Sequence, residues 1–209
     1  MTARLFDGAH RAAGGRVLAR WLRAIALLCT FLATAYATAA PPVAVSHARL
    51  APAALGEGLA IYAQIDFELP AALEDAVGRG IALYFVVDFE LHQKRWYWFD
   101  KKLAARSLQY RLSFSPLTRQ YRLARGSFAQ SFESLQAALG VLRHISGWTV
   151  LGPDAIDPHA DLDDYHAQVR FRLDVSRLPK PFQVTALTQD DWSLSSNWQS
   201  LSWATPGPF

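Results

Sequence analysis

Residues 81–91 of the 209-residue chain read IALYFVVDFEL, and this stretch decides the fold. Apolar side chains stand at every second position, and the carboxylates Asp88 and Glu90 fall between them. Period-2 alternation is typical of a β-strand that turns one face to a core and the other to water. We therefore expect a half-buried strand, with Phe85 on its apolar face and Asp88 on its exposed face.

The same alternation recurs along the chain, which predicts a protein built mainly of strands. Further strands are expected at 61–69, 108–115 and 167–175, and weaker ones at 43–50, 94–99, 119–124, 182–188 and 192–203. One-sided alternation favours antiparallel sheets with one wet face. Seven or more short strands with few helices favour an antiparallel two-sheet β-sandwich of the immunoglobulin-like kind.

Two short helices are expected to interrupt the strands. In 70–78 a proline stands where a first helical turn tolerates it. In 131–146 apolar residues recur at helical spacing, Ser131 is a candidate N-cap, and Gly147 can end the helix.

Residues 1–40 carry the pattern of an export signal. Five arginines precede an uncharged apolar run, Ala24 to Ala40, which ends in A-x-A spacings. The sequence leaves open whether this signal peptide is cleaved or stays as an N-terminal membrane anchor helix. Both alternatives place residues 41–209, expected to form a single β-sandwich domain, in the periplasm or otherwise outside the cytoplasm.

Composition excludes several classes of protein. Apolar residues make up 51% of the chain, which excludes intrinsic disorder. The formal charge of +3 comes from the N-terminal arginines, so the body carries a net charge near −1 and does not bind polyanions through net charge. The one cysteine, Cys29, lies in the apolar run, so the body forms no disulfide.

Motifs for chemistry are weak. The chain contains no phosphate-binding glycine loop, and we expect no catalytic, cofactor-binding or metal-ligating residues. The acidic segment 154–166 approaches a calcium-loop register but lacks its glycine and its final glutamate. The carboxylate pairs Asp66/Glu68 and Asp88/Glu90 are interpreted as solvated side chains on a sheet face.

A basic stretch rich in aromatic residues is the most suggestive feature. Residues 92–125 hold nine basic groups and one acidic group. The stretch either pairs internally with acidic neighbours, with its aromatic rings in the core, or binds a partner. That partner is an acidic protein, anionic lipid head groups or a cell-wall polymer, since export argues against nucleic acid. In a strand, Trp96 and Trp98 share one face, so one set of rings is expected to pack inward. The candidate interaction surface comprises Lys94, Arg95, Trp96, Trp98, Lys101 and Lys102.

Three tryptophans near the end of the chain leave a second alternative open. Trp192, Trp198 and Trp203 lie among serines. They suit a groove for a glycan or peptide, but packing onto the sheets is the favoured interpretation.

Short motifs in a fixed order resemble a known family of exported bacterial proteins, the domain of unknown function 4390. The resemblance covers about residues 45–203 and rests on these motifs: Gly80-Ile81 before Leu83-Tyr84-Phe85, Trp98-Phe99-Asp100, Leu117-Thr118 with Tyr121, Leu178-Pro179-x-Pro181, and Asp191-Trp192-x-Leu194-x-Ser196. It implies no catalytic residues. Its members are often encoded beside a sensor histidine kinase, which implies an accessory role in the cell envelope.

From these features we expect a non-enzymatic envelope protein that binds another protein, such as the extracytoplasmic domain of a membrane sensor. Membrane contact is expected only through the N-terminal segment. The alternative is an enzyme, or a small-ligand or glycan binder, acting on an envelope polymer. A cleft with converging Asp and His side chains would favour the enzyme, and a flat aromatic and basic face would favour the binding protein.

Overall fold

Two β-sheets make up most of the protein. The computed structural model describes residues 43–54, 58–97, 99–156 and 161–204. The first sheet has four strands in the order β10-β1-β2-β7. Its strands are β1 (Val43–Pro52), β2 (Leu59–Phe67), β7 (His144–Leu151) and β10 (Ser202–Trp203). Strand β1 pairs antiparallel with β2 and parallel with β10.

The second sheet has six strands in the order β6-β5-β4-β3-β8-β9, all antiparallel. Its strands are β3 (Leu83–Gln93), β4 (Lys101–Ser115), β5 (Gln120–Arg125), β6 (Phe128–Phe132), β8 (Tyr165–Leu173) and β9 (Gln199–Ser200). The stretch that decides the fold is β3, which pairs with β4 on one side and with β8 on the other.

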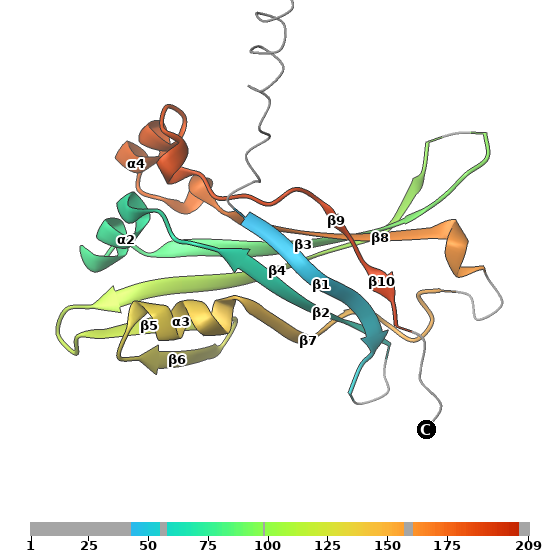
Figure 1. The fold of residues 1–209 in the computed structure, drawn as a ribbon, viewed down its shortest axis with the longest axis horizontal. Coiled ribbons are helices and arrows are strands. Elements are labelled where there is room, and N and C mark those ends of the chain that lie inside the picture. Colours follow the sequence, from blue (N-terminus) through green and yellow to red (C-terminus); the bar gives the residue numbers. More distant parts are fainter. Residues whose placement is uncertain (1–42, 55–57, 98, 157–160, 205–209) are drawn as a thin grey trace, which may run out of the picture. The chain divides into compact units, whose positions relative to one another are not determined.

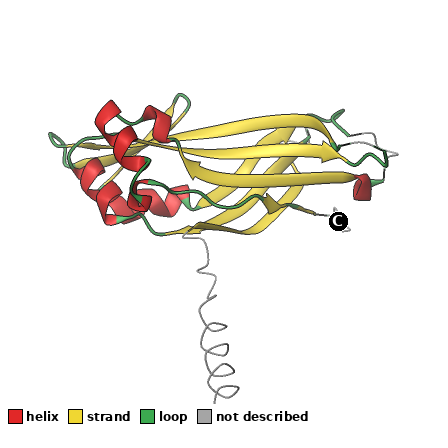
Figure 2. Ribbon diagram, turned by 90° about the horizontal axis from the view of Figure 1, so that it is seen from above, coloured by secondary structure: helices red, strands yellow, loops and turns green. Residues whose placement is uncertain are grey.

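Three short α-helices lie in the described part of the chain, one more than expected, and they gather at one end of the sheets (Figures 1 and 2). They are α2 (Ala71–Gly78), α3 (Leu135–Leu142) and α4 (Lys180–Ala186). Single 3₁₀ turns occur at η1 (Leu162–Asp164), η2 (Val175–Arg177) and η3 (Asp190–Trp192).

The core lies between the two sheets, which pack face to face (Figure 2). Phe67 of β2 lies 5.1 Å from Phe171 of β8 and 6.2 Å from Phe85 of β3, measured between ring centroids. Phe85 and Phe171 stack at 5.6 Å, and both are fully buried. The alternation that predicted these strands therefore identified the inward face correctly.

The outer face of β3 is not the wet face that alternation predicts. Asp88 is only 9% exposed, and Val86 beside it is 4% exposed. Strands β4 and β8 flank β3 on both sides, so long side chains from β8 cover the polar positions. The prediction that Asp88 is exposed is wrong.

Four of the expected elements differ in the structure. In the strand expected at 192–203, only Gln199–Ser200 and Ser202–Trp203 are strands. Residues 94–99 are a turn, and 182–188 fall largely in α4, where Pro179 at the N-cap starts a helix. The expected helix 131–146 is shorter, because β6 continues to Phe132 and β7 begins at His144. Its N-cap is Ser134, whose hydroxyl accepts a hydrogen bond from the Ala137 backbone N–H at 3.2 Å.

The export signal predicted for residues 1–40 lies outside the described residues. In the part of the chain that the structure describes, none of the helices has the length and apolar character to cross a membrane. The segment Pro41–Phe209 forms one compact unit.

Candidate functional site

The predicted interaction residues lie at the turn of the β3–β4 hairpin. Strand β3 ends at Gln93, which pairs with Lys101 at the start of β4. The described residues between them, 94–97 and 99–100, lie outside the β3–β4 ladder and include a turn (Figure 1). Trp98 lies outside the described residues. The prediction of a strand at 94–99 is wrong, because the chain reverses direction within this segment.

Three aromatic rings at this turn are exposed to solvent. Trp96 is 95% exposed, Phe99 is 86% exposed and Tyr97 is 64% exposed. Trp96 and Tyr97 contact each other edge to face, with 5.0 Å between ring centroids. The expectation that one set of rings packs inward is wrong for these residues, because a turn does not alternate faces as a strand does. We call Trp96, Tyr97 and Phe99 the aromatic tip.

The base of the hairpin is held by hydrogen bonds. The Lys94 backbone N–H donates to the carbonyl oxygen of Asp164 at 2.8 Å. Its ammonium group donates to the carbonyl oxygen of Asp163, also at 2.8 Å. The tip therefore projects from a hairpin that is tied to η1 at the start of β8.

Only part of the predicted charge surface is free. Lys102 forms an ion pair with Glu90, which also contacts the His92 imidazole at 2.9 Å. Burial raises the pKa of Glu90, but the hydrogen bonds from Lys102 and His92 outweigh it and lower the pKa. Among the described residues, neither Arg95 nor Lys101 forms an ion pair, and both are exposed.

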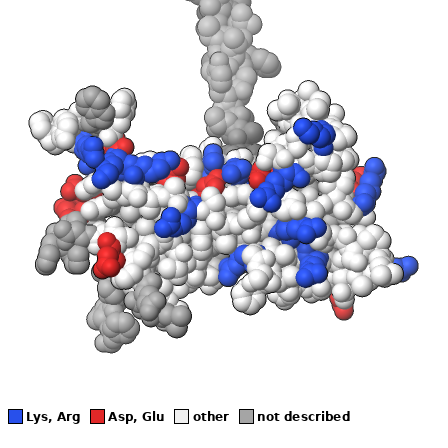
Figure 3. Space-filling model, turned by 180° about the vertical axis from the view of Figure 1, so that it is seen from behind, with Lys and Arg blue, Asp and Glu red and all other residues white. Residues whose placement is uncertain are grey.

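The basic stretch does not form one patch. Lys and Arg side chains are spread along the molecule in Figure 3, with Asp and Glu between some of them. Arg122 and Arg125 lie on opposite faces of β5, because they are three residues apart in one strand. The nine basic groups of 92–125 therefore lie on different faces of the protein and do not form one binding surface.

Asp66 and Asp88 from the two carboxylate pairs have internal hydrogen-bond partners, whereas Glu68 is exposed. Asp88 accepts hydrogen bonds from Ser107 at 2.8 Å, Arg172 at 2.8 Å and Arg170 at 3.0 Å. Asp66 accepts hydrogen bonds from Ser46 at 2.6 Å and Gln64 at 2.9 Å, and these hydrogen bonds lower its pKa. Both carboxylates are held in the charged form, which suits a structural hydrogen-bond acceptor rather than a general acid.

The C-terminal tryptophans follow the packing interpretation. Trp192 is 9% exposed and its ring stacks on Phe182 at 5.0 Å. The Arg170 guanidinium lies 4.5 Å from the centroid of the half-buried Trp198 ring. Trp203 is half-buried and packs against the core.

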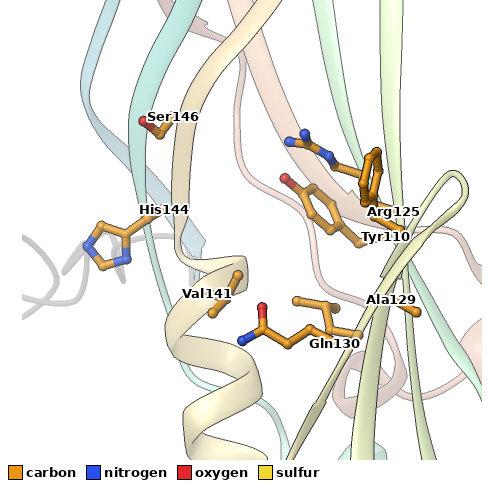
Figure 4. Close-up of a pocket in the computed structure, with 9 residues that line it drawn as sticks. Tyr110, Arg125, Ala129, Gln130, Val141, His144 and Ser146 are labelled. Carbon is orange, nitrogen blue, oxygen red and sulfur yellow. The ribbon is translucent and has the colours of Figure 1, made fainter.

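A cleft of about 450 Å³ opens between the two sheets (Figure 4). Strands β4, β5 and β6 form one wall, and α3 and β7 form the other. Tyr110, Leu123, Arg125, Phe128, Val141 and His144 are among the residues that line it. The lining contains no carboxylate, and the His144 imidazole contacts the Gly140 carbonyl oxygen at 2.9 Å. The cleft therefore lacks the converging Asp and His that would favour an enzyme.

The acidic segment before β8 shows a local cap rather than a cation cage. The Asp161 carboxylate accepts a hydrogen bond from the Asp163 backbone N–H at 3.0 Å. Residues 157–160, which include part of the calcium-like register, lie outside the described residues. Across the described residues, no group of three or more potential metal ligands converges.

The protein-family comparison matches residues 40–202 to a family described as a domain of unknown function, DUF4390. The chain belongs to the DUF4390 family. The matched region contains both the β3–β4 hairpin and the cleft. No curated protein and no solved structure matches the chain. Membership in DUF4390 assigns no activity, so the geometry carries the functional argument.

The alternation of the sequence did not point to the cleft. Tyr110 falls in the strand that the sequence predicts at 108–115, but the alternation gave no sign that the tyrosine hydroxyl meets open space. Arg125 stood out only as one of nine basic residues. The strand order, which brings α3 and β7 opposite β4 and β5, was the missing information.

Proposed function

We propose that this DUF4390 protein is an exported, non-enzymatic binding module that contacts a partner protein through the aromatic tip. The observation that carries the proposal is the exposure of three neighbouring aromatic side chains on an anchored turn. Exposed clusters of aromatic residues are typical of interaction sites, since Trp and Tyr contribute a large share of binding energy at interfaces.

The strand pairing supports an immunoglobulin-like β-sandwich. Strands β1, β2 and β7 correspond to A, B and E of that fold, and β3, β8 and β9 correspond to C, F and G. Strands β4 and β5 then take the places of C′ and C″, which variable-type domains add to the second sheet.

This correspondence puts the aromatic tip at an unusual end of the sandwich. Variable domains bind through the B–C, C′–C″ and F–G loops. In this protein the B–C and F–G connections hold α2 and α4, at the helix-bearing end (Figure 1). The tip is the C–C′ turn, at the other end of β3 and β4. The surface available for recognition is therefore the end opposite the antibody-like loops.

The charge around the tip favours a protein partner over an anionic membrane. Arg95 and Lys101 form no ion pair with any residue that the structure describes, but the carboxylates of Asp161, Asp163 and Asp164 lie in the segment to which the hairpin is tied. Mixed charge gives little attraction to anionic lipid. A partner with an apolar groove and an acidic rim fits the three rings and the two free cations.

The extracytoplasmic domain of a membrane sensor is the partner we propose. The pattern of residues 1–40 supports export, and the association of the family with sensor kinases supports the choice of a sensor. The alternative of an enzyme acting on an envelope polymer has less support, because Asp66, Asp88 and Glu90 are engaged in internal hydrogen bonds and the cleft lining holds no carboxylate.

Site-specific photocrosslinking tests the proposal. A photoreactive amino acid replaces Tyr97 in the full chain, expressed in its native cells. The matched control replaces Leu117, which is 94% exposed in the β4–β5 turn. These two turns lie at opposite ends of the 15-residue strand β4, roughly 45 Å apart at about 3.3 Å per residue.

We expect a light-dependent adduct with one membrane protein at position 97 and none at position 117. A Trp96→Ser and Phe99→Ser double variant should abolish the adduct and keep the melting temperature, since both rings are exposed. Equal adducts at both positions, or adducts only with lipid, would refute the proposal.

A further inference from the structure

We propose that the cleft between the sheets binds a small amphipathic carboxylate, a molecule with one carboxylate and a short apolar chain. Arg125 and Tyr110 hold the carboxylate, and Leu123, Phe128 and Val141 contact the chain. This inference is separate from the aromatic tip, because it concerns the space between the two sheets.

Tyr110 is the first observation. The residue as a whole is only 5% exposed, and its hydroxyl forms no hydrogen bond with another described residue. In Figure 4 the hydroxyl points into the cleft, towards α3 and β7. Among the described residues, the one buried side-chain polar atom without a partner is Nε of Arg170, so the Tyr110 hydroxyl is open to the cleft rather than sealed from it. An open hydroxyl can donate a hydrogen bond to a ligand oxygen in the cleft.

Arg125 is the second observation. It is the cross-strand partner of Tyr110, so the two side chains leave neighbouring strands side by side on the same face. No carboxylate of the described residues pairs with its guanidinium, and none lines the cleft. The cleft therefore carries a positive charge and a hydroxyl donor that are both free to bind an anion. A guanidinium matches the two oxygens of a carboxylate in a bidentate arrangement.

The rest of the lining suits an apolar chain. Leu123 precedes Arg125 by two residues on the same face of β5, and Phe128 is the cross-strand partner of Arg125 in β6. Phe128 is 78% exposed and Val141, on the opposite wall, is 43% exposed. The volume of 450 Å³ equals roughly fifteen water-sized groups of about 30 Å³ each, within the usual range for small-ligand sites.

Three ligands separate the contribution of the carboxylate charge from that of the apolar tail. Each is titrated calorimetrically into the purified full-length protein. Octanoate has both features, 1-octanol has the chain alone, and acetate has the charge alone. We expect saturable binding of octanoate, with an affinity about tenfold or more above that of octanol, and no saturable binding of acetate. Absent octanoate binding, or equal binding of octanol, would overturn the proposal.

Matched variants locate the site. Arg125→Gln should weaken octanoate binding about tenfold or more, and Tyr110→Phe about threefold to tenfold, because one removes a charged donor and the other a neutral donor. The control is Arg122→Gln, which removes the same charge from the opposite face of β5. Its effect should be about twofold or less.

The melting temperature of each variant is measured without ligand. A loss of octanoate binding counts as evidence only for variants whose melting temperature equals that of the wild type. Arg125 and Arg122 are both exposed, so neither substitution should unfold the protein. If Arg122→Gln weakens octanoate binding as much as Arg125→Gln does, the binding is general charge attraction and the cleft is not the site.

Discussion

Asp88 is the residue at which sequence pattern and structure differ most. Its substitution should change the free energy of unfolding by a measurable amount. Its carboxylate accepts hydrogen bonds from Ser107, Arg170 and Arg172, and the residue is 9% exposed. Removing one partner of a fully buried ion pair costs about 3–5 kcal/mol, because the remaining charge stays buried and unpaired. The side chains of Arg170 and Arg172 are 32% and 33% exposed in the folded protein. Water can therefore hydrate the two guanidinium groups and compensate part of that loss. We therefore predict that Asp88→Ala lowers the free energy of unfolding by about 2–3 kcal/mol.

Urea unfolding followed by tryptophan fluorescence measures this change as a shift of the midpoint at constant slope. The matched control is Glu68→Ala, which removes an exposed carboxylate at the end of β2. That control should change the free energy of unfolding by about 0.5 kcal/mol or less. If the two variants unfold at the same urea concentration, the Asp88 ion pairs contribute nothing and the reasoning is refuted.

The pH dependence gives an independent check of the same residue. Burial raises the pKa of Asp88, but hydrogen bonds from Arg172, Ser107 and Arg170 outweigh it and hold the pKa below its usual 3.8. A carboxylate with a lowered folded-state pKa stabilises the protein above the unfolded-state pKa, and this contribution is lost as the pH falls through the folded-state pKa. The stability difference between wild type and Asp88→Asn should therefore shrink below about pH 4. A difference that grows on acidification would contradict the assignment.

Three further predictions concern the core, a turn and the location of the chain. Phe85→Ala should lower the free energy of unfolding by about 3–5 kcal/mol in urea, because the ring is fully buried against Phe171 and Phe67; a loss below about 1 kcal/mol would contradict this packing. Gly58→Ala should lower the melting temperature clearly, since Gly58 has φ +92° and an added Cβ would clash with the Leu151 carbonyl oxygen; an unchanged melt would contradict the geometry of this turn. A reporter that is active only in the cytoplasm, fused after the last residue, should be silent, and strong activity would disprove export.

Strand alternation was sufficient to predict the main features of the fold. The mainly β fold with two sheets follows from side-chain period alone, and Phe67, Phe85 and Phe171 lie on the faces that the pattern assigned to them. The pattern could not show which strands become neighbours. Asp88 is covered because β3 lies between β4 and β8, and nothing local in IALYFVVDFEL encodes that position.

The residues of the two proposed surfaces were predictable only in part. The basic and aromatic composition of 94–102 drew attention to the segment that holds the aromatic tip, but the alternation argument predicted a strand where the structure has a turn. The turn is visible only once Gln93 is paired with Lys101. The cleft depends on contacts across the chain, since Tyr110 and Val141 are brought to opposite walls by the packing of the sheets.

The two proposed surfaces lie on the same long strand but are far apart. Lys101 begins β4 beside the aromatic tip, and Tyr110 follows nine residues later, roughly 30 Å along the strand at about 3.3 Å per residue. At that separation, substitutions without shared partners act additively. A change at Trp96 should therefore leave octanoate binding intact, and a change at Arg125 should leave crosslinking from position 97 intact. The side chains of the two surfaces share no contact, although β4 connects the two surfaces. The crosslinking experiment therefore tests the aromatic tip alone, and the octanoate titration tests the cleft alone.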